Sequence, residues 1–260
     1  MENTIGFYDS GVGGLNILQK TISHLGNIDF IYVADNLNLP YGNKSDSFIL
    51  NRSFEIASFL IKEKANTIVL ACNTATAVSI DFLRQRYKNI NFIGVEPAVK
   101  TAFIKKTDKE VLLLATDLTG KSFRLKKLIE SFNFDKNLKI IPCPQLVEAI
   151  EYNYPRSKIL DLLKKILHNF VNKKNLTIIL GCTHYEYIKD EISSLLKNCE
   201  IIDGSVGVSK QIIKSYKVTD FQNKKVGISK ICSTAKNMDF INHYLVKLNL
   251  DALKCSFIKI

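Results

Sequence analysis

The 260-residue sequence has no run of about 20 apolar residues, the length that a helix needs to cross a membrane. Its opening residues, MENTIGFYDS, also lack the basic region and following apolar region of a secretory signal. We therefore expect a cytoplasmic protein that does not enter a membrane.

The sequence also lacks any CxxC motif among its six cysteines. In a cytosolic chain these residues are expected to be thiols rather than disulfides. Cys182 and His184 form a Cys-x-His pair, but no second pair accompanies it, so we predict no metal site.

Complete nucleotide-binding motifs are missing as well. In YDSGVGG (8–14), Gly11 and Gly13 fit the start of a G-x-G-x-x-G pattern, but Asn16 occupies the position of the third glycine. Asp9 would repel a phosphate there, and no P-loop occurs. These glycines instead suggest close approach of the backbone to a small ligand, and we expect no cofactor.

The net charge of +11 raises the question of a nucleic-acid partner. The excess is mostly lysine, scattered among acids and asparagines, and no segment interleaves arginine with aromatic residues as a base-stacking surface does. The charge pattern therefore favours a solvated surface. A non-enzymatic, basic nucleic-acid-binding protein stays as an alternative, which predicts salt-sensitive binding.

Short aliphatic runs alternate with segments of helical periodicity, which predicts an α/β fold with mainly parallel sheets flanked by helices. One such helical segment covers 45–64, with Ser45 as its N-cap. The expected strands are 4–8, 29–34, 67–71, 91–95, 110–115, 138–141, 177–181 and 200–203.

The two halves of the sequence echo each other. TIVLAC and TIILGC end at Cys72 and Cys182, which lie 110 positions apart, and Ser10 and Thr116, each following a strand, lie 106 positions apart. We predict two pseudo-symmetric domains, one of residues 1–97 with 209–260 and one of residues 98–208, with the active site in the cleft between them. The segment 226–232 and a helical pattern over 234–248 are expected to return to the first domain.

Both cysteines fall at the carboxyl ends of predicted strands, where open α/β sheets bind ligands. The free N–H groups of a following helix would favour a thiolate and attract a carboxylate. A hydrolase needs one thiol, whereas inversion at carbon needs one group to remove a proton and another to deliver one to the opposite face. We expect the other four cysteines, Cys143, Cys199, Cys232 and Cys255, to be small buried hydrophobes.

Polar residues near these strand ends allow two interpretations. Asn73, Thr74 and Thr183 can cap helices or bind a small anion, and Asp9 with Ser10 can do either. LPYGNKS (39–45) is either a plain turn or a wall over a ligand. Glu148 and Glu151, three apart on a predicted helix, would usually be solvated, and His184 can pair with a carboxylate.

Five motifs together resemble the cofactor-independent aspartate/glutamate racemase superfamily, and within it the glutamate racemases. They extend in order from near the N-terminus to the second cysteine, and CNTATA with GCTHY is the most specific combination. The motifs are DSGVGG (9–14), ADNLNLPYGNKS (34–45), ACNTATA (71–77), GVEPAVKTA (94–102) and LGCTHYEY (180–187).

The resemblance implies interconversion of L- and D-glutamate without pyridoxal phosphate or metal, with the D-isomer supplied to peptidoglycan synthesis, by a chain we expect to be a homodimer. Cys72 would act on D-glutamate and Cys182 on L-glutamate, assisted by Asp9, His184 and Glu151. An aspartate racemase, or a one-thiol decarboxylase of the same superfamily, is the alternative. The positions that match substrate-holding residues are Asp9, Ser10, Pro40, Tyr41, Gly42, Asn73, Thr74, Thr116, Thr119, Thr183 and His184.

Overall fold

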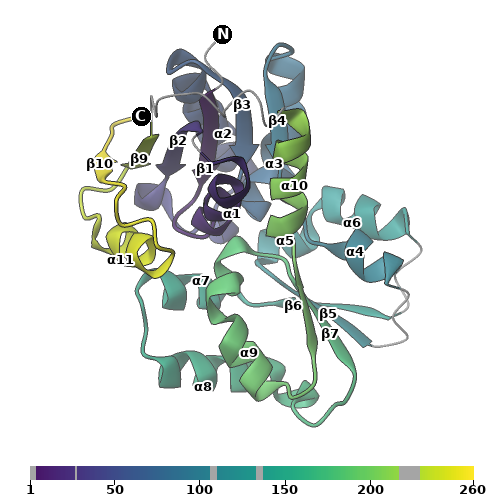
Figure 1. Ribbon diagram of the computed structural model, residues 1–260. Helices are drawn as coiled ribbons and strands as arrows, with labels where there is room; N and C mark the ends of the chain where they lie inside the picture. The colour runs from purple at the N-terminus through teal and green to yellow at the C-terminus, as the bar shows by residue number, and fades with distance from the viewer. Residues whose placement is uncertain (1–3, 27, 106–109, 133–136, 217–228) are drawn as a thin grey trace. The chain divides into compact units, whose positions relative to one another are not determined.

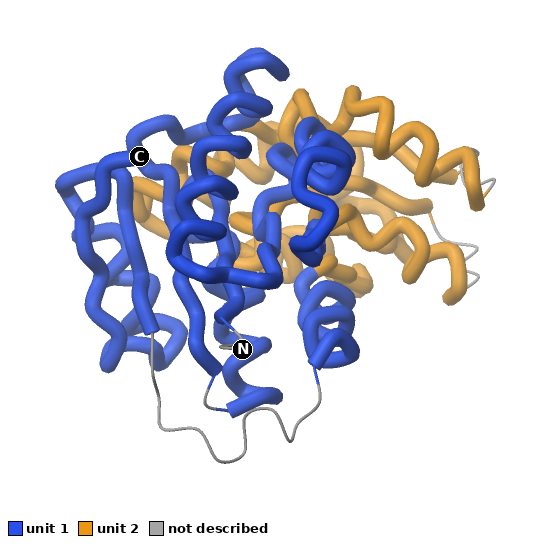
Figure 2. The backbone as a smooth tube through the Cα atoms, turned by 90° about the horizontal axis from the view of Figure 1, so that it is seen from above, with its two compact units in different colours: residues 1–95, 205–260 blue, residues 96–204 orange. Residues whose placement is uncertain are grey.

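The computed structural model describes residues 4–26, 28–105, 110–132, 137–216 and 229–260. The chain forms two compact units, residues 1–95 with 205–260 (unit 1) and residues 96–204 (unit 2), as Figures 1 and 2 show. In the parts that are described, no helix combines the length and apolarity needed to cross a bilayer.

Unit 1 contains a six-stranded sheet in the order β10–β9–β2–β1–β3–β4, in which every pair of neighbours is parallel. All residues of β1 and β2 are buried, which is typical of parallel sheets covered on both faces. The strands are β1 (Thr4–Asp9), β2 (Asp29–Ala34), β3 (Ala65–Leu70), β4 (Asn91–Gly94), β9 (Ser229–Ser233) and β10 (Cys255–Phe257).

The helices of unit 1 follow the amphipathic segments of the sequence. The segment predicted at 45–64 forms a helix from Asp46 to Lys62, and the Ser45 side chain caps it by accepting the Phe48 N–H at 3.2 Å. The helical elements are α1 (Leu15–Leu25), η1 (Asn36–Asn38), η2 (Tyr41–Asn43), α2 (Asp46–Lys62), α3 (Asn73–Arg86), α10 (Ser205–Ser215) and α11 (Asp239–Lys247).

Unit 2 contains a four-stranded parallel sheet in the order β6–β5–β7–β8, with β5 (Glu110–Ala115), β6 (Leu138–Pro142), β7 (Leu176–Leu180) and β8 (Glu200–Asp203). Its core includes apolar residues of β5, β7, α4 and α6. The helical elements are α4 (Val99–Ile104), α5 (Asp117–Lys121), α6 (Phe123–Glu130), α7 (Pro144–Glu151), α8 (Arg156–Leu167), η3 (His168–Phe170), η4 (Thr183–Ile188) and α9 (Lys189–Leu195).

The two sheets repeat one strand order. In each unit the first strand lies between the second and the third, and the fourth follows the third, as β2–β1–β3–β4 and β6–β5–β7–β8 show. β3 and β7, which precede the two cysteines, are therefore topologically equivalent. The α/β class with parallel sheets is confirmed, and each of the eight predicted strands is present within two residues of its predicted ends.

The boundaries of unit 2 lie two and four residues before the predicted ones. The C-terminal difference has a physical reason, because residues 205–208 are the first turn of α10, which packs on α1, and Lys20 donates a hydrogen bond to Ser205. Of the predicted segment 226–232, residues 226–228 lie outside the described residues, and the remainder belongs to β9 beside β2. The predicted 234–248 helix starts later, at Asp239.

Candidate active site

Cys72 lies just beyond the carboxyl end of β3 and is the N-cap residue of α3. It is 5% exposed, and its thiol lies 3.9 Å from the Ser10 hydroxyl, which follows the neighbouring strand β1. Parallel pairing of β1 with β3 brings these two strand ends together. The N–H groups of the first turn of α3 favour negative charge at this position.

The Asp9 carboxylate is buried at the end of β1 and is held by main-chain donors. Its Oδ1 accepts the Ser10 N–H at 2.7 Å and its Oδ2 accepts the Gly14 N–H at 2.6 Å. A Cβ atom on Gly14 would come within 2.6 Å of the Ala71 Cβ, so glycine permits this close approach of the loop to the end of β3. The Asp9 carboxyl group is thus fixed in position on β1, the strand adjacent to the one that Cys72 follows.

Asn73 begins α3 with its side chain buried. Its Nδ2 makes no hydrogen bond with any described residue, although it is fully enclosed. Buried amide donors rarely stay unsatisfied, so this one indicates a position where a ligand or water accepts a hydrogen bond. Thr74 is also buried, whereas Thr76 is already used, since its hydroxyl donates to the Leu70 carbonyl at 3.2 Å.

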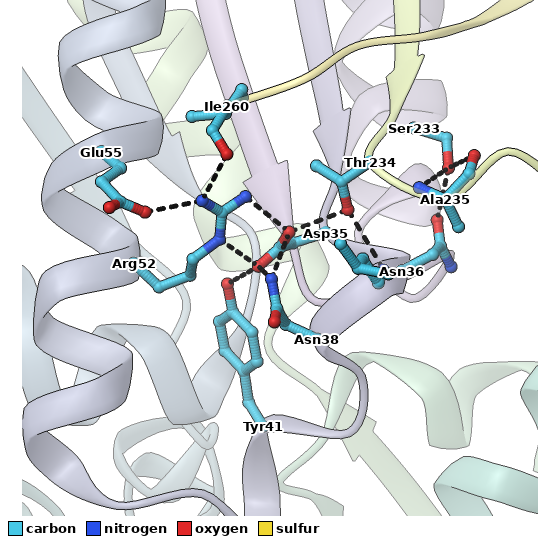
Figure 3. A network of polar contacts seen from close by, with 11 residues as sticks. Asp35, Asn36, Asn38, Tyr41, Arg52, Glu55, Ser233, Thr234, Ala235 and Ile260 are labelled. Carbon is cyan, nitrogen blue, oxygen red and sulfur yellow. Dashed lines mark hydrogen bonds and ion pairs between the residues drawn. The ribbon is translucent and has the colours of Figure 1, made fainter.

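The segment that carries Pro40, Tyr41 and Gly42 follows β2 at the same edge of the sheet (Figure 3). Pro40 and Gly42 are partly exposed, while Tyr41 is buried and donates its hydroxyl hydrogen to Asp35 Oδ2 at 2.7 Å. Burial raises the pKa of Tyr41, and the Asp35 carboxylate raises it further. The Tyr41 hydroxyl hydrogen is therefore used in a buried hydrogen bond to Asp35. Only the rest of the turn remains available to a ligand.

Asp35, Arg52 and Thr234 form a buried polar network beside this turn, and the sequence motifs did not single them out. Arg52 binds Asp35 through two hydrogen bonds of 2.9 and 2.8 Å, and both side chains are buried. Burial would raise the pKa of Asp35, but hydrogen bonds from Arg52 and Tyr41 hold it below its ordinary value. The sequence did contain a signal for this ion pair. Asp35 directly follows a predicted strand, and Arg52 is the single arginine of the next amphipathic helix.

Cys182 occupies the equivalent position in unit 2, beyond the carboxyl end of β7, and is 8% exposed. His184 Nδ1 lies 3.7 Å from its sulfur, and His184 Nε2 lies 2.5 Å from Glu151 Oε1. Glu151 ends α7 and is buried, whereas Glu148 on the same helix is exposed. The two acids therefore do not share a solvated face, and Glu151 belongs to a buried Cys–His–Glu cluster.

The charge of His184 is set by its partners. Burial alone would lower the pKa of His184, but contacts with Cys182 and Glu151 raise it well above the ordinary value of 6.5. The two contacts therefore favour the protonated form of the imidazole, next to Cys182. An imidazolium beside a cysteine is an arrangement that proton-transfer sites use.

Glu151→Gln removes the carboxylate that holds this proton, so we expect the pKa of His184 to fall, as an NMR titration of its ring would measure. A raised pKa contributes stability that is complete below 6.5 and is lost as pH rises through the raised value. The free energy of unfolding of the parent should therefore fall more steeply above pH 6.5 than that of Glu151→Gln.

The exposed Glu148→Gln substitution is the matched control and should leave the pKa of His184 and the pH profile of stability unchanged. An unaltered His184 titration in Glu151→Gln would contradict the assignment of Glu151 as the partner that holds the proton.

The threonines of unit 2 are buried near the same sheet edge. Thr116 is the N-cap of α5, where its hydroxyl accepts the Thr119 N–H at 3.3 Å and donates to the Thr119 hydroxyl at 3.0 Å. Thr116 and Thr119 thus form a cap, which does not prevent them from also contacting a ligand. Thr183 follows Cys182 and is 9% exposed.

The remaining cysteines differ in part from expectation. No disulfide joins any of the six, all of which lie in described parts of the chain. Cys143 and Cys232 are buried as expected, and burial together with Cys182 raises the pKa of Cys143 to about 12. Cys199 and Cys255 are only partly buried, because each lies near a surface turn or an edge strand.

Each unit therefore gathers one cluster at the carboxyl edge of its sheet. Unit 1 brings together Asp9, Ser10, Cys72 and Asn73, and unit 2 brings together Cys182, His184 and Glu151. Among the described residues, no group of three or more His, Cys, Asp or Glu side chains could hold a metal ion.

The family model described as Asp/Glu/Hydantoin racemase matches residues 31–208, which is more than half of the chain. The chain belongs to the Asp/Glu/hydantoin racemase family. Membership in this racemase family agrees with the motifs around Cys72 and Cys182, and it identifies the chain as one of a family of isomerases.

Within the racemase family, the chain is similar to individual proteins that are named glutamate racemases. It is 37% identical over 240 residues to a protein of Clostridium acetobutylicum named glutamate racemase, covering 91% of this chain and 93% of the relative. It is 39% identical over 214 residues to glutamate racemase 2 of Bacillus subtilis, covering 81% and 80%. The resemblance to glutamate racemases is thereby confirmed.

Solved structures of racemases share the fold. Glutamate racemase from Francisella tularensis in complex with D-glutamate has a TM-score of 0.85 at 27% identity, and the Escherichia coli glutamate racemase in complex with L-glutamate has a TM-score of 0.84 at 26% identity. Each comparison covers 99% of this chain and 98% of the other.

Proposed function

We propose that this protein interconverts L- and D-glutamate, with Cys72 and Cys182 acting on opposite faces of the substrate Cα. The observation that carries the proposal is that the two thiols occupy equivalent positions in two sheets of the same strand order. Cys72 follows β3 and Cys182 follows β7, and each side chain is buried beside polar partners. A reaction that needed one nucleophile would not require this duplication.

The chemistry balances without a net change in redox state. One cysteine, as a thiolate, accepts the proton of the Cα–H bond, and the electron pair passes to the α-carboxylate as an enolate-like species. The other cysteine, as a thiol, donates its proton to the opposite face of Cα. Each turnover leaves the two sulfurs with exchanged protonation, so reaction in the reverse direction uses the same groups in opposite roles.

The polar partners of the thiols are suited to proton transfer in both directions. In unit 2 the His184 imidazolium, held by Glu151, stabilises the thiolate of Cys182, which we assign to L-glutamate. In unit 1 the helix α3 N-terminus favours the thiolate of Cys72, which we assign to D-glutamate, and buried Asp9 stands on the adjacent strand. The two halves thus support their thiols by different means.

Neutral donors in the two clusters would hold the substrate carboxylates. The enclosed Asn73 Nδ2 and the hydroxyls of Ser10, Thr74 and Thr183 can donate hydrogen bonds to an anion without adding charge next to the thiols. The main chain of the Pro40–Gly42 turn, together with Thr116 and Thr119, completes the proposed substrate-holding set.

We further propose that the reaction requires no cofactor, because the two thiols supply both proton transfers, and that its D-glutamate serves peptidoglycan synthesis. Purified protein without added cofactor should racemise glutamate in D₂O and place one solvent deuterium at Cα, as circular dichroism and mass spectrometry would measure. Aspartate should be assayed in parallel, because an aspartate racemase would prefer the shorter substrate. Absence of turnover on glutamate, with or without turnover on aspartate, would refute the proposal.

A further inference from the structure

We propose that Thr234, a residue of the C-terminal part of the chain, is a positioning residue for the racemase reaction, because it fixes the Pro40–Gly42 turn through Asp35 and the Leu37 main chain. This inference rests on the proposed function, in which that turn (called here the PYG turn) holds substrate. Thr234 does not itself belong to any motif of the sequence that points to catalysis.

Thr234 is held in place by the sheet. It follows β9, and its N–H donates to the Ala34 carbonyl at the end of β2 at 3.1 Å. The residue is 5% exposed. Because β9 pairs with β2 along its whole length, the position of this threonine relative to the end of β2 is fixed by the register of two strands rather than by a loop.

The Thr234 hydroxyl bridges two groups of the segment that follows β2 (Figure 3). It donates to Asp35 Oδ1 at 2.9 Å and accepts the Leu37 N–H at 3.1 Å, so both its donor and an acceptor site are used. The segment between Asp35 and the PYG turn is also held by the Ser233 hydroxyl, which donates to Asn36 Oδ1 at 3.3 Å, whereas the Leu37 side chain of η1 is 71% exposed.

Asp35 links Thr234 to the PYG turn, because its carboxylate binds both Thr234 and Tyr41. Its carboxylate accepts hydrogen bonds from Asn38 at 3.1 Å and from the Tyr41 hydroxyl at 2.7 Å, in addition to those from Thr234 and Arg52 (Figure 3). Five donors in all thus converge on one carboxylate, counting the two from Arg52. Loss of the Thr234 hydroxyl removes one of them and also releases the Leu37 N–H.

The anchored segment lies next to the unit 1 cluster. The Asp35 N–H donates to the Asp9 carbonyl at 2.9 Å, and η2, which includes Tyr41, packs against α3, the helix that Cys72 caps. A displacement of the PYG turn therefore alters the walls around a bound substrate without touching the sulfur. The expected result is weaker binding of both enantiomers rather than slower proton transfer.

The decisive comparison is Thr234→Val against Thr234→Ser. Valine keeps the shape but lacks the hydroxyl, so KM for D- and for L-glutamate should rise roughly tenfold, the expected consequence of losing buried hydrogen bonds, with kcat changed by less than about threefold. Serine keeps the hydroxyl and should stay within about twofold of the parent.

Thr21→Val is the matched control. Thr21 is a buried threonine of unit 1 whose hydroxyl donates to the Ile17 carbonyl of its own helix at 2.7 Å, away from Asp35. It undergoes the same chemical change and should leave KM unaltered. If Thr234→Val lowers the thermal midpoint but keeps the parental KM, or if Thr234→Ser raises KM as much as valine does, the inference is wrong.

Amide hydrogen exchange of the segment 36–44 provides a readout that does not depend on turnover. The Leu37 amide should exchange roughly tenfold faster in Thr234→Val than in the parent, and not in Thr21→Val. An inactive parent with this exchange pattern would refute the proposed function, and with it the role in racemisation, and would leave only the anchoring of the turn by Thr234. An active parent with unchanged exchange and KM in Thr234→Val would refute the positioning role alone.

Discussion

Racemisation of glutamate is expected to fall by roughly a thousandfold or more in both Cys72→Ala and Cys182→Ala. Inversion needs a base on one face and an acid on the other, so loss of either sulfur stops the complete reaction. Alanine is small and apolar, and both positions are at strand ends where a side chain of that size fits, so the folded state should persist. Circular dichroism of each variant would confirm this.

The two variants should differ in which enantiomer still exchanges its Cα hydrogen with D₂O. A protein that retains one thiol can remove and return a proton on one face without inversion. Any exchange that persists in Cys182→Ala should be confined to D-glutamate, and any that persists in Cys72→Ala should be confined to L-glutamate. NMR of each pure enantiomer measures this directly.

Cys199→Ser and Cys255→Ser are the controls, because these cysteines are partly exposed and outside both clusters. They should retain parental activity. Undiminished racemisation by either alanine variant, or exchange of the same enantiomer by both, would rule out the assignment of one sulfur to each face.

Arg52→Met should reduce the free energy of unfolding by about 3–5 kcal/mol, the range found when one partner of a buried ion pair is removed. Methionine leaves the Asp35 carboxylate buried without its strongest partner, and it also removes the 3.1 Å hydrogen bond from Arg52 to the Ile260 main-chain oxygen (Figure 3). Adding Asp35→Asn to Arg52→Met should recover part of the loss, because the amide carries no charge. Urea denaturation of the three variants measures these differences.

The pH dependence of this effect follows from the lowered pKa of Asp35. A carboxyl group whose pKa is lowered on folding adds stability above its ordinary value of 3.8, and that stability is lost as pH falls through the lower folded value. The difference between parent and Arg52→Met should therefore be complete at neutral pH and should shrink only below pH 3.8.

Arg124→Met provides the control for removing an arginine. Arg124 pairs with Glu96, but both side chains are partly exposed, at 27% and 34%, so this substitution should cost less than about 1 kcal/mol. If Arg124→Met and Arg52→Met reduce the free energy of unfolding equally, burial of the Arg52–Asp35 pair does not make its loss more costly than the loss of an exposed pair.

The central strands β1, β2, β3, β5 and β7 were predictable from sequence because their residues are mostly apolar and buried, and the turns that end them are polar. TIVLAC and TIILGC indicated both the strands and the chemistry, since a cysteine at the end of a buried strand, followed by polar residues, is an unusual combination. The similarity between the two halves of the sequence also agrees with the strand order that the two sheets share.

Other features depended on long-range contacts that no local pattern carries. Arg52 appeared to be one polar residue of an amphipathic helix, and Thr234 one hydroxyl in a polar segment, yet both bind Asp35 from positions 17 and 199 residues away. Glu151 resembled Glu148 by spacing, and only the packing of α7 against η4 separates the buried acid from the exposed one. Pairing of β9 with β2 places Thr234, whereas Arg52 lies on α2 and Glu151 on α7, so the packing of those helices determined the other two contacts.

The interrupted path of the chain through unit 1 has a consequence for its biosynthesis. On the ribosome, β2 emerges early, but its outer edge remains without a neighbour until β9 is made almost 200 residues later, after the whole of unit 2. Unit 2 is continuous and can complete its sheet first. The nascent chain must therefore keep an unfinished strand edge from associating with other polypeptides throughout most of its translation.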